Sequence, residues 1–531
     1  MKATDVFVHC LENEGVEYIF GIVGNEILDL ANSLSHSEQI QYITVHHEQG
    51  AAFMADVYGR LSGKVGVCLA TLGPGATNLL TGIASATLDH SPMVTITGQA
   101  ALERQHKHSH QYLDVIQIME PVTKWAIQVK EASAIPEIIR KAFRIAKLEK
   151  RGAVAIELPE NLAIQSIPPI VLPVTPEPVS IPSYDTILAA QKIIQQSNRP
   201  FILVGNGVIR SGAADEFLTF AETLQAPVTH SFTAKGILHK EHKQNYFTFG
   251  FMEKDEVMPG LHEADLLIVI GLDHNERLPK EWNRKKTTIL HIDSHPAEID
   301  EFYPVQIELV GNLKETLACF QSFDLPSKAW VPAGNLKNRI EQAYNISWNH
   351  DSIASLPLTI ENILHVIEMI ADDETIVLSD VGSHKVSVAR TFQPKKPNRL
   401  VISNGLAAIG ISLPGAIGAK LACPNEPVIC LTGDGGFLTN AAELETAKRL
   451  GLSFVIIVLN DSVLKIEEDT MRKRFGKSYG VGFHNPDFVD FANSFGIIGV
   501  RPKTLDQFAE MLINCLHSSS NITLIDVPVN N

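Results

Sequence analysis

The chain of 531 residues is 45% hydrophobic, enough for about three domains of ordinary size, each with its own core. Its formal net charge of −16 disfavours nucleic acid and anionic membranes as partners, and no apolar run approaches the roughly 20 residues that span a bilayer. The six cysteines form no Cys-x-x-Cys pair, so neither a disulfide framework nor a zinc ribbon is indicated, and a cytoplasmic location fits.

Residues 1–166 alternate helical and strand patterns, which predicts an open α/β domain with parallel connections. The N-terminus has the pattern of an amphipathic helix capped at Thr4 and ended at Gly15, rather than that of a signal peptide. A helix is expected over residues 49–61, and strands are expected over residues 18–21, 40–45, 65–71 and 93–97.

Three features of this first segment can carry chemistry. Glu48 lies where a strand becomes a helix, at the sheet edge where open α/β folds build their sites. A glutamate that opens a helix is, however, also an ordinary favourable charge at the helix N-terminus. Gly73 and Gly75 are typical of a tight turn. The alternate histidines of residues 106–110 have no supporting carboxylate or cysteine, which favours a solvated loop over a metal site.

The rest of the chain divides at two polar stretches. Residues 167–183 carry prolines at nearly every third position and predict an extended linker. Residues 184–325 predict a central Rossmann-like domain, residues 326–357 a second connection, and residues 358–531 a third α/β domain. The spacing of the glycines from Gly205 to Gly212 does not match the dinucleotide fingerprint, so this turn is interpreted as structural.

The stretch 427–462 contains two apolar runs separated by one helical pattern, which predicts a strand, helix, strand unit. In a right-handed parallel unit both strands end at the same edge of the sheet, so Asp434 and Asn460 can converge there. The glycines beside Asp434 leave backbone N–H groups free for phosphate oxygens. A carboxylate and an amide oxygen are ligands that suit Mg²⁺. This stretch therefore predicts a site for a diphosphate and Mg²⁺.

The Gly-Asp-Gly turn followed by an asparagine at the end of the next strand resembles the signature of thiamine diphosphate enzymes. From end to end, the chain resembles the acetolactate (acetohydroxyacid) synthase family. The segments that carry this resemblance are HHEQGAAFMADVYGRLSGKVGVCLATLGPGATNLLTGIASA, TGQ at 97–99, SDVGSHK, SNGLAAIGISLPGAIGAKLA, GDGGFLTNAAELETAKRLGL, VLNDS and IDVPV. The resemblance implies three open, doubly wound parallel-sheet domains of the thiamine diphosphate-binding fold.

In that family the first domain of one subunit binds the cofactor's pyrimidine and the third domain of a partner binds its diphosphate. The resemblance therefore implies a homodimer or homotetramer with active sites at the subunit interface. By the same resemblance, Glu48 would hydrogen-bond the pyrimidine and drive its amino group to the imino form. Ile409 would wedge the cofactor into its bent shape beside the backbone of Ala407; Ile409 could also be an ordinary core isoleucine, and the two interpretations are compatible.

The remaining implied roles follow the family motifs. The catalytic positions implied near the reacting atoms are Glu48, Gln99, His110 and Gln111. The implied cofactor contacts are Glu48, Gly73, Gly382, Ser383, His384, Ala407, Ile409, Gly433, Asp434, Gly435, Gly436, Asn460 and Ser462. The implied Mg²⁺ ligands are Asp434, Asn460 and the backbone carbonyl of Ser462.

The resemblance implies an enzyme that decarboxylates pyruvate and ligates the hydroxyethyl group to a second 2-oxoacid, giving 2-acetolactate and CO₂. Such an enzyme could serve branched-chain amino acid biosynthesis or pyruvate disposal. Two departures bear on this reading. GLDHNERLPKEWN at 271–283 is closer to the branch without flavin, so FAD is not expected. Leu464 and Asp469 replace the usual aromatic residues; Asp469 would repel a 2-oxoacid acceptor if it faced the pocket, unless it belongs to a solvated helix face.

Three other functions are compatible with parts of the pattern. A thiamine diphosphate-dependent decarboxylase would release an aldehyde, and a related carboligase would use a different acceptor. A pyruvate oxidase would need tightly bound flavin. A degenerate binding protein is disfavoured because Glu48, Asp434 and Asn460 are all present.

Overall fold

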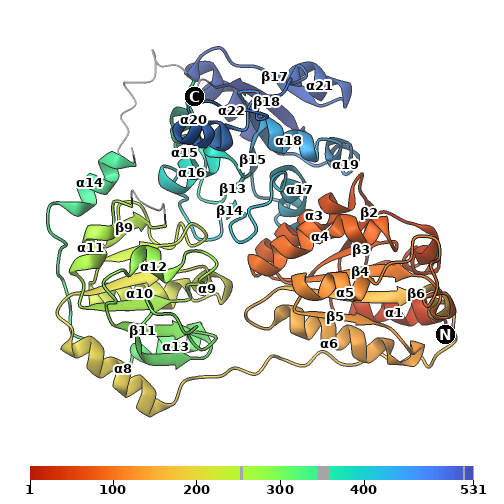
Figure 1. Ribbon diagram of the computed structural model, residues 1–531, viewed down its shortest axis with the longest axis horizontal. Coiled ribbons are helices and arrows are strands. Elements are labelled where there is room, and N and C mark those ends of the chain that lie inside the picture. The colour runs from red at the N-terminus through yellow and green to blue at the C-terminus, as the bar shows by residue number, and fades with distance from the viewer. Residues whose placement is uncertain (251–254, 345–357, 518–520, 530–531) are drawn as a thin grey trace. The chain divides into compact units, whose positions relative to one another are not determined.

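The computed structural model describes residues 1–250, 255–344, 358–517 and 521–529 (Figure 1). These residues form three six-stranded parallel sheets interleaved with helices, which confirms the predicted α/β class. The strand orders are β2-β1-β3-β4-β6-β5, β12-β11-β10-β7-β8-β9 and β14-β13-β15-β16-β18-β17. In each sheet the order reverses at the strand that comes first in the chain (β1, β7 and β13), as in doubly wound folds.

The first sheet contains strands that are buried along their whole length, as parallel strands covered on both faces require. Its strands are β1 (Tyr18–Gly21), β2 (Gln41–Thr44), β3 (Gly66–Ala70), β4 (Met93–Gln99), β5 (Trp125–Gln128) and β6 (Ala153–Pro159). Its helices are α1 (Ala3–Asn13), α2 (Leu28–Leu34), α3 (Glu48–Ser62), α4 (Pro74–Leu88), α5 (Val115–Met119), α6 (Ile135–Lys147) and α7 (Glu160–Ala163).

Two expectations for this segment need correction. Strands β5 and β6 were not among the expected strands, because short apolar runs do not distinguish a strand from a buried helix. Thr4 is not the cap of α1: the helix begins at Ala3, and the buried Thr4 hydroxyl accepts a hydrogen bond from Ser33 Oγ at 2.8 Å. A tertiary contact therefore uses the group that was expected to cap the helix.

The central sheet follows residues 167–183, all described, to which the structure assigns neither helix nor strand. Its strands are β7 (Pro200–Val204), β8 (Val228–His230), β9 (Asn245–Thr248), β10 (Leu266–Ile270), β11 (Ile289–Asp293) and β12 (Val305–Val310). The helices of this part are α8 (Tyr184–Gln196), α9 (Gly207–Arg210), α10 (Ala214–Leu224), α11 (Met258–Glu263), α12 (Pro279–Trp282), α13 (Leu313–Phe320) and α14 (Leu336–Ala343). Helix α14 lies within the expected second connection, of which residues 345–357 are outside the described residues.

The third sheet holds the stretch that predicted the diphosphate site. Its strands are β13 (Ile376–Ser379), β14 (Leu400–Ile402), β15 (Val428–Gly433), β16 (Val455–Asn460), β17 (Ile498–Val500) and β18 (Thr523–Pro528). The helices are α15 (Ile360–Ile370), α16 (Ser383–Arg390), α17 (Ser412–Ala422), α18 (Asp434–Thr439), α19 (Glu443–Arg449), α20 (Lys465–Phe475), α21 (Phe488–Ser494) and α22 (Leu505–His517).

The single helix expected between β15 and β16 is wrong, because the structure has two short helices, α18 and α19. They are separated at Asn440, whose side-chain amide donates to the carbonyl oxygen of Gly410 at 2.8 Å. The break allows one short helix to begin at Asp434 and the other to begin at Glu443.

The chain forms two compact units. The first comprises Met1–Glu177, Gly405–Arg501 and Cys515–Val527, and the second includes Pro178–Asn404 and Pro502–Asn514. Inside the first unit α3 packs closely against α17. A Cβ atom at Gly418 would lie only 2.3 Å from the carbonyl oxygen of Met54, so this close approach requires glycine. The pairing positions Glu48, the first residue of α3, and the loop that precedes α17.

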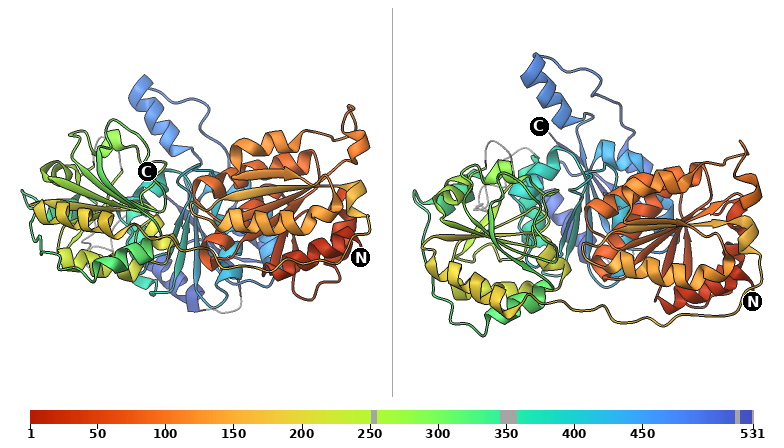
Figure 2. Two further views of the ribbon diagram at one scale, coloured as in Figure 1. Left: turned by 90° about the horizontal axis from the view of Figure 1, so that it is seen from below. Right: turned by 60° about the horizontal axis from the view of Figure 1, so that its bottom comes forward.

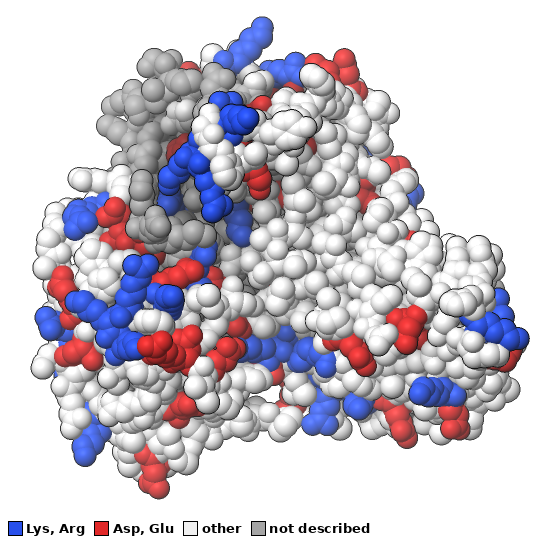
Figure 3. Space-filling view, viewed as in Figure 1, with Lys and Arg blue, Asp and Glu red and all other residues white. Residues whose placement is uncertain are grey.

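Helix α20 differs from its neighbours in the first unit because none of its residues is buried. In both views of Figure 2 it stands clear of the sheet as a blue helix. On the face drawn in Figure 3, positive and negative side chains are interspersed. Among the described helices, not one combines the length and the apolar character needed to cross a membrane.

Candidate active site

Asp434 is the centre of a hydrogen-bond cluster at the carboxyl ends of β15 and β16. Its side chain is buried, and its Oδ1 accepts from the backbone N–H of Gly435 at 2.7 Å. Its Oδ2 accepts from the backbone N–H groups of Asp461 at 3.1 Å and Ser462 at 2.6 Å. The structure therefore brings together the two strand ends that the sequence predicted would converge.

Asn460 is held in one orientation by Asp526 of β18, which is itself bound by Arg501. Its Nδ2 donates to Asp526 Oδ1 at 3.0 Å, and the buried Asp526 also accepts from Arg501 Nε at 2.7 Å. Because a carboxylate can only accept, the amide nitrogen of Asn460 faces Asp526 and its oxygen faces the Asp434 cluster. This orientation presents the oxygen as a ligand.

The donor set of this cluster consists of oxygen atoms. Asp434 Oδ2, Asn460 Oδ1 and Ser462 Oγ all lie within 3.2 Å of one atom, the side-chain Nδ2 of Asn485. Carboxylate, amide and other oxygen donors fit a hard cation such as Mg²⁺ better than a soft one. Ser462 has φ of +59°, a left-handed conformation that turns the chain sharply just after Asn460.

The glycine turn leads directly into α18, whose first residues are Asp434, Gly435 and Gly436. The backbone N–H groups at the start of a helix have no partner inside the helix; that of Gly435 donates to Asp434 Oδ1, and the others can approach anionic oxygens. Gly433, at the end of β15, precedes the helix in an extended conformation. The local geometry is that expected of a phosphate-binding turn.

Gly382, Ser383 and His384 belong to the second unit, at the start of α16. Gly382 has φ of +157° and precedes the helix, and the side chain of His384 is buried. In the same unit Lys385 Nζ donates to the carbonyl oxygen of Ser403 at 2.7 Å, which ties the first turn of α16 to the end of β14.

Glu48 opens α3 and is 7% exposed. Its Oε2 accepts from Asn78 Nδ2 at 2.9 Å, so α4, which follows the glycine turn, holds the carboxylate. Because Asn78 donates to Oε2, the described residues leave the other carboxylate oxygen of Glu48, Oε1, available to accept a hydrogen bond. The ordinary reading of Glu48 as a charge at a helix N-terminus agrees with its position but does not account for its burial, because helix-end charges are normally solvated.

A second buried carboxylate supports the start of α3 from α19. Glu443 Oε1 accepts from the backbone N–H groups of His46 at 3.0 Å and His47 at 3.1 Å. Its Oε2 accepts from Thr446 Oγ1 at 2.7 Å. Burial raises the pKa of Glu443 above its ordinary value, against the lowering effect of these hydrogen bonds. Glu443 thus fixes the backbone immediately before Glu48.

The loop before α17 carries Ala407 and Ile409. Ala407 has φ of +53°, and the Ile409 side chain is 38% exposed, so Ile409 is not the core isoleucine of the alternative reading. The loop is anchored where the backbone N–H of Gly405 donates to Asp89 Oδ1 at 2.7 Å. An exposed bulky side chain on a fixed loop is available to contact a ligand.

The other predicted positions fall in different environments. His110 and Gln111 are exposed, and a Cβ atom at Gly73, which has φ of +55°, would lie 2.6 Å from the carbonyl oxygen of Gln111. Gly73 thus lets this loop approach the turn before α4. Gln99 is fully buried, and its Nε2 donates to Leu113 O at 2.9 Å and to Glu157 Oε1 at 2.6 Å. The structure therefore points the Gln99 amide into the protein.

Two features that might have carried chemistry are solvated in the structure. His106, His108 and His110 are exposed, and the described part of the chain has no group of three His, Cys, Asp or Glu side chains arranged for a metal. The side chain of Asp469 in α20 is 60% exposed and pairs with Lys465 Nζ at 2.9 Å.

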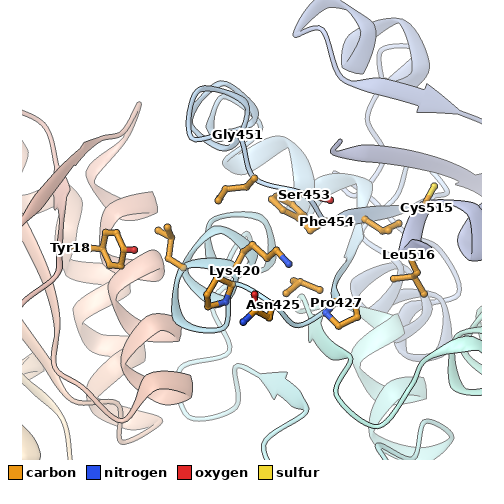
Figure 4. Close-up of a pocket in the computed structure, with 14 residues that line it drawn as sticks. Tyr18, Lys420, Asn425, Pro427, Gly451, Ser453, Phe454, Cys515 and Leu516 are labelled. Atoms are coloured by element: carbon orange, nitrogen blue, oxygen red, sulfur yellow. The ribbon is translucent and has the colours of Figure 1, made fainter. Parts of the chain in front are cut away.

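A separate cavity of about 460 Å³ opens at the other ends of β15 and β16 (Figure 4). Val428 and Val455, the first residues of these strands, line it together with Lys420. Lys420 Nζ already donates to the carbonyl oxygen of Glu426 at 2.8 Å. Since the cluster of Asp434 and Asn460 lies at the carboxyl ends of the strands, the cavity is not part of it.

Sequence reasoning did not identify Asn485, Asp526, Arg501, Glu443 or Asn78 as functional residues. Asp526 is the most detectable, because it is a charged residue inside an apolar closing strand. Glu443 and Asn78 lie within the segments that carried the family resemblance but had no recognisable chemistry of their own. Nothing in the local sequence around Asn485 indicates that it reaches Asp434.

The chain matches three family descriptions in the order of its three sheets. These are "Thiamine pyrophosphate enzyme, N-terminal TPP binding domain" over residues 1–118, the central domain over residues 187–320, and the C-terminal TPP binding domain over residues 380–527.

Several curated proteins are similar over nearly the full length. Acetolactate synthase of Bacillus subtilis (strain 168) is 34% identical over 99% of this chain and 93% of its own length. The probable acetolactate synthase large subunit of Methanococcus aeolicus is 34% identical over 97% of this chain and 90% of its own. Acetolactate synthase isozyme 3 large subunit of Escherichia coli (strain K12) is 30% identical over 100% of this chain and 94% of its own.

Proposed function

Because the chain belongs to the acetolactate synthase family of thiamine pyrophosphate enzymes, we propose that it is a thiamine diphosphate- and Mg²⁺-dependent acetolactate synthase. Its reaction joins two pyruvate molecules into 2-acetolactate with loss of one CO₂. The observation that carries the proposal is the convergence of Asp434, Asn460 and Ser462 beside the glycine turn that opens α18. The same edge thus offers oxygen ligands and backbone donors for a diphosphate.

The proposed contacts are those that the family resemblance implies, and the local geometry supports several of them. Asp434, Asn460 and the backbone carbonyl of Ser462 hold the cation, and Gly433, Gly435 and Gly436 line the diphosphate with backbone that carries no side chain. From the family motif, Gly382, Ser383 and His384 are proposed as further diphosphate contacts. When bound, thiamine diphosphate supplies the electron sink for decarboxylation.

Glu48 is proposed to exchange a proton with the pyrimidine ring of the cofactor. Its burial supports this role, as does the fact that Asn78 is its one side-chain donor among the described residues, because a desolvated carboxylate with an oxygen left to accept is suited to proton transfer. Ile409 and Ala407 are proposed to shape the cofactor, Gly73 to contact it, and Gln99, His110 and Gln111 to lie near the reacting atoms. For Gln99 this role requires that its amide either breaks its hydrogen bond to Glu157 or acts on the substrate through Glu157.

The acceptor in this proposal is a second 2-oxoacid. The pairing of Asp469 with Lys465 supports this choice, because a neutralised carboxylate repels an anionic acceptor less than a bare one does. We further propose a homodimer or homotetramer with sites shared between subunits, located in the cytoplasm. Six cysteines without a Cys-x-x-Cys pair support a reducing compartment.

We also propose that the reaction does not require FAD. The glycines at the end of β7 serve close backbone packing, since a Cβ atom at Gly207 would lie 2.8 Å from Gly271 Cα. The buried carboxylate of Glu276 lies beside the same turn and accepts from the backbone N–H of Asn206 at 3.4 Å. A carboxylate there disfavours the pyrophosphate of a dinucleotide.

A product assay tests the proposed function. The purified chain is incubated with pyruvate, Mg²⁺ and thiamine diphosphate, and acetolactate is measured as acetoin after acid treatment. Acetolactate is the expected product; acetaldehyde without acetolactate would indicate a decarboxylase instead. A yellow preparation with a flavin spectrum would point to an oxidase.

Glu48→Gln provides the matched control for this assay. The variant keeps the size of the side chain but cannot accept or return a proton, so turnover should fall roughly 100-fold or more. Its circular dichroism spectrum and Tm should stay close to those of the wild-type protein. Full activity in this variant would contradict the proposed role of Glu48.

A further inference from the structure

The loop of residues 405–410, which precedes α17, is fixed at both of its ends by a buried side chain. At the first end, the backbone N–H of Gly405 donates to Asp89 Oδ1 at 2.7 Å. At the other end, Asn440 Nδ2 donates to the carbonyl oxygen of Gly410 at 2.8 Å. Because Asp89 and Asn440 are both buried, water competes little for either hydrogen bond.

The middle of this loop is not fixed by packing in a core. The side chains of Leu406 and Ile409 are 37% and 38% exposed, and Ala407 is exposed as well. Ala407 has φ of +53°, a left-handed conformation that costs free energy in a residue with a Cβ atom and persists only where the surrounding structure imposes it. The position of Ile409 therefore depends on the hydrogen bonds at the two ends of the loop.

Asp89 is itself held by α3, the helix that begins at Glu48. Its Oδ2 accepts from Arg60 Nη2 at 2.9 Å, and the same guanidinium donates from Nε to Asp56 Oδ1 at 2.7 Å. Arg60 and Asp56 both belong to α3, and the Asp56 side chain is fully buried. Because the charge of Arg60 keeps Asp89 a strong acceptor, the first end of the loop is firmly tied to α3.

Asn440 ties the other end of the loop to the glycine turn of the proposed site. It directly follows α18, the helix that begins at Asp434. A Cβ atom at Gly410, which has φ of +89°, would lie 1.8 Å from Thr439 Oγ1, so the loop lies directly against the end of α18. Thr439 Oγ1 in turn donates to the carbonyl oxygen of Gly436 at 2.7 Å, which connects this contact to the turn.

We propose that Asp89 and Asn440 are positioning residues that determine where Ile409 meets the bound cofactor. Neither residue is catalytic, because each acts through the backbone of the loop. Asp89 fixes the loop relative to the helix that begins at Glu48, and Asn440 fixes it relative to the turn that contains Asp434. The proposal rests on the proposed function, because Ile409 is the residue assigned there to shape thiamine diphosphate.

The test compares full-length Asp89→Ala and Asn440→Ala with the wild-type protein, in the presence of Mg²⁺ and thiamine diphosphate and without substrate. Thiamine diphosphate has no stereocentre, so the circular dichroism that it acquires on binding reports the asymmetric conformation in which the protein holds it. Each variant should lose much of this induced signal, because Ile409 no longer has a fixed position. The Kd for thiamine diphosphate should rise roughly tenfold, as expected when a hydrogen bond that orders a binding loop is lost. Asn440→Ala leaves the ion pair of Asp89 intact, so it carries the test if Asp89→Ala is too unstable to purify.

Ser91→Ala is the matched control, because Ser91 is fully buried beside Asp56 but no described hydrogen bond joins it to the loop. Its Oγ donates to Asp56 Oδ1 at 2.5 Å and accepts from Arg60 Nε at 2.9 Å. Its Tm should fall, while the induced signal and the Kd stay at the wild-type values. Wild-type values in every loop variant that folds, or equal changes in Ser91→Ala, would overturn this proposal alone. If the wild-type protein does not bind thiamine diphosphate, both this proposal and the proposed function are wrong.

Discussion

Glu157, a buried residue of the first sheet, binds the amide of Gln99, which belongs to the proposed site. It lies in β6, is 1% exposed, and accepts hydrogen bonds from the amides of Gln99 at 2.6 Å and Gln128 at 2.5 Å. Burial raises its pKa to about 7, although the two amide donors act in the opposite direction. At neutral pH the protonation of Glu157 therefore changes with small changes in pH.

This pKa predicts how stability depends on pH. Because the pKa is raised in the folded protein, folding takes up a proton, and the stabilising contribution is lost as the pH rises from about 5 through 7. Glu157→Gln should remove up to about 3 kcal/mol of this pH dependence. The free energy of unfolding in urea, measured for both proteins from pH 5 to 8, checks this prediction.

Glu160→Gln is the control for that series, because the Glu160 side chain is 38% exposed and pairs with Arg104. Its profile of unfolding free energy against pH should run parallel to the wild-type profile. If the Glu157→Gln profile is also parallel to the wild-type one, Glu157 does not titrate in this range and the interpretation is wrong.

At the scale of elements, the contact between α19 and the start of α3 is the one on which catalysis should depend most. Helix α3 begins at Glu48, and the two N–H groups that precede it are held by the Glu443 carboxylate from α19. Two residues almost 400 positions apart thus fix the direction in which Glu48 points.

Glu443→Ala should leave the backbone N–H groups of His46 and His47 without their partner. Hydrogen bonds to a charged acceptor contribute about 1.5 to 3 kcal/mol, so the free energy of unfolding should fall by an amount of this order. Because Glu48 loses its fixed position, kcat should fall roughly tenfold or more while KM changes less. Steady-state kinetics and urea unfolding measure both effects.

Glu443→Gln separates orientation from simple loss of packing. Its amide oxygen can still accept from both N–H groups, since these hydrogen bonds use one oxygen of Glu443. It should retain most of the kcat that Glu443→Ala loses. Equal kcat values in the two variants would show that Glu443 does not position Glu48.

At the scale of the whole molecule, the proposed site draws on segments from both ends of the chain. Glu48 is held by Asn78, from the first sheet's segment, whereas Asp434 is held by residues from Gly435 to Asn485. The family resemblance implies that these two halves come from different subunits, which agrees with the proposed homodimer.

Mixing two inactive variants tests this arrangement. Glu48→Gln and Asp434→Ala each damage every site of their own homodimer. A mixed dimer would carry both substitutions in one site and leave the other intact, so random reassociation should restore roughly a quarter of wild-type activity. Activity of the mixture equal to the mean of the separate variants would contradict sites shared between subunits.

The sequence by itself determined the class of fold and the place of the proposed diphosphate site. Strands β1, β2 and β3 lie within one residue of their predicted bounds, because short apolar runs between turn residues depend on local patterning. The convergence of Asp434 with the end of β16 followed from the handedness of parallel crossovers. These are rules that act within a few dozen residues.

Only the tertiary structure decided which other side chains complete the site. Asn485 lies 51 positions after Asp434, and Asp526 lies 66 positions after Asn460, and no local pattern encodes either contact. The same holds for Thr4, which bonds Ser33 instead of capping its helix, and for Gln99, whose amide is bound by Glu157. Polar side chains are satisfied by whichever partner packing brings within reach, and packing is a property of the whole fold.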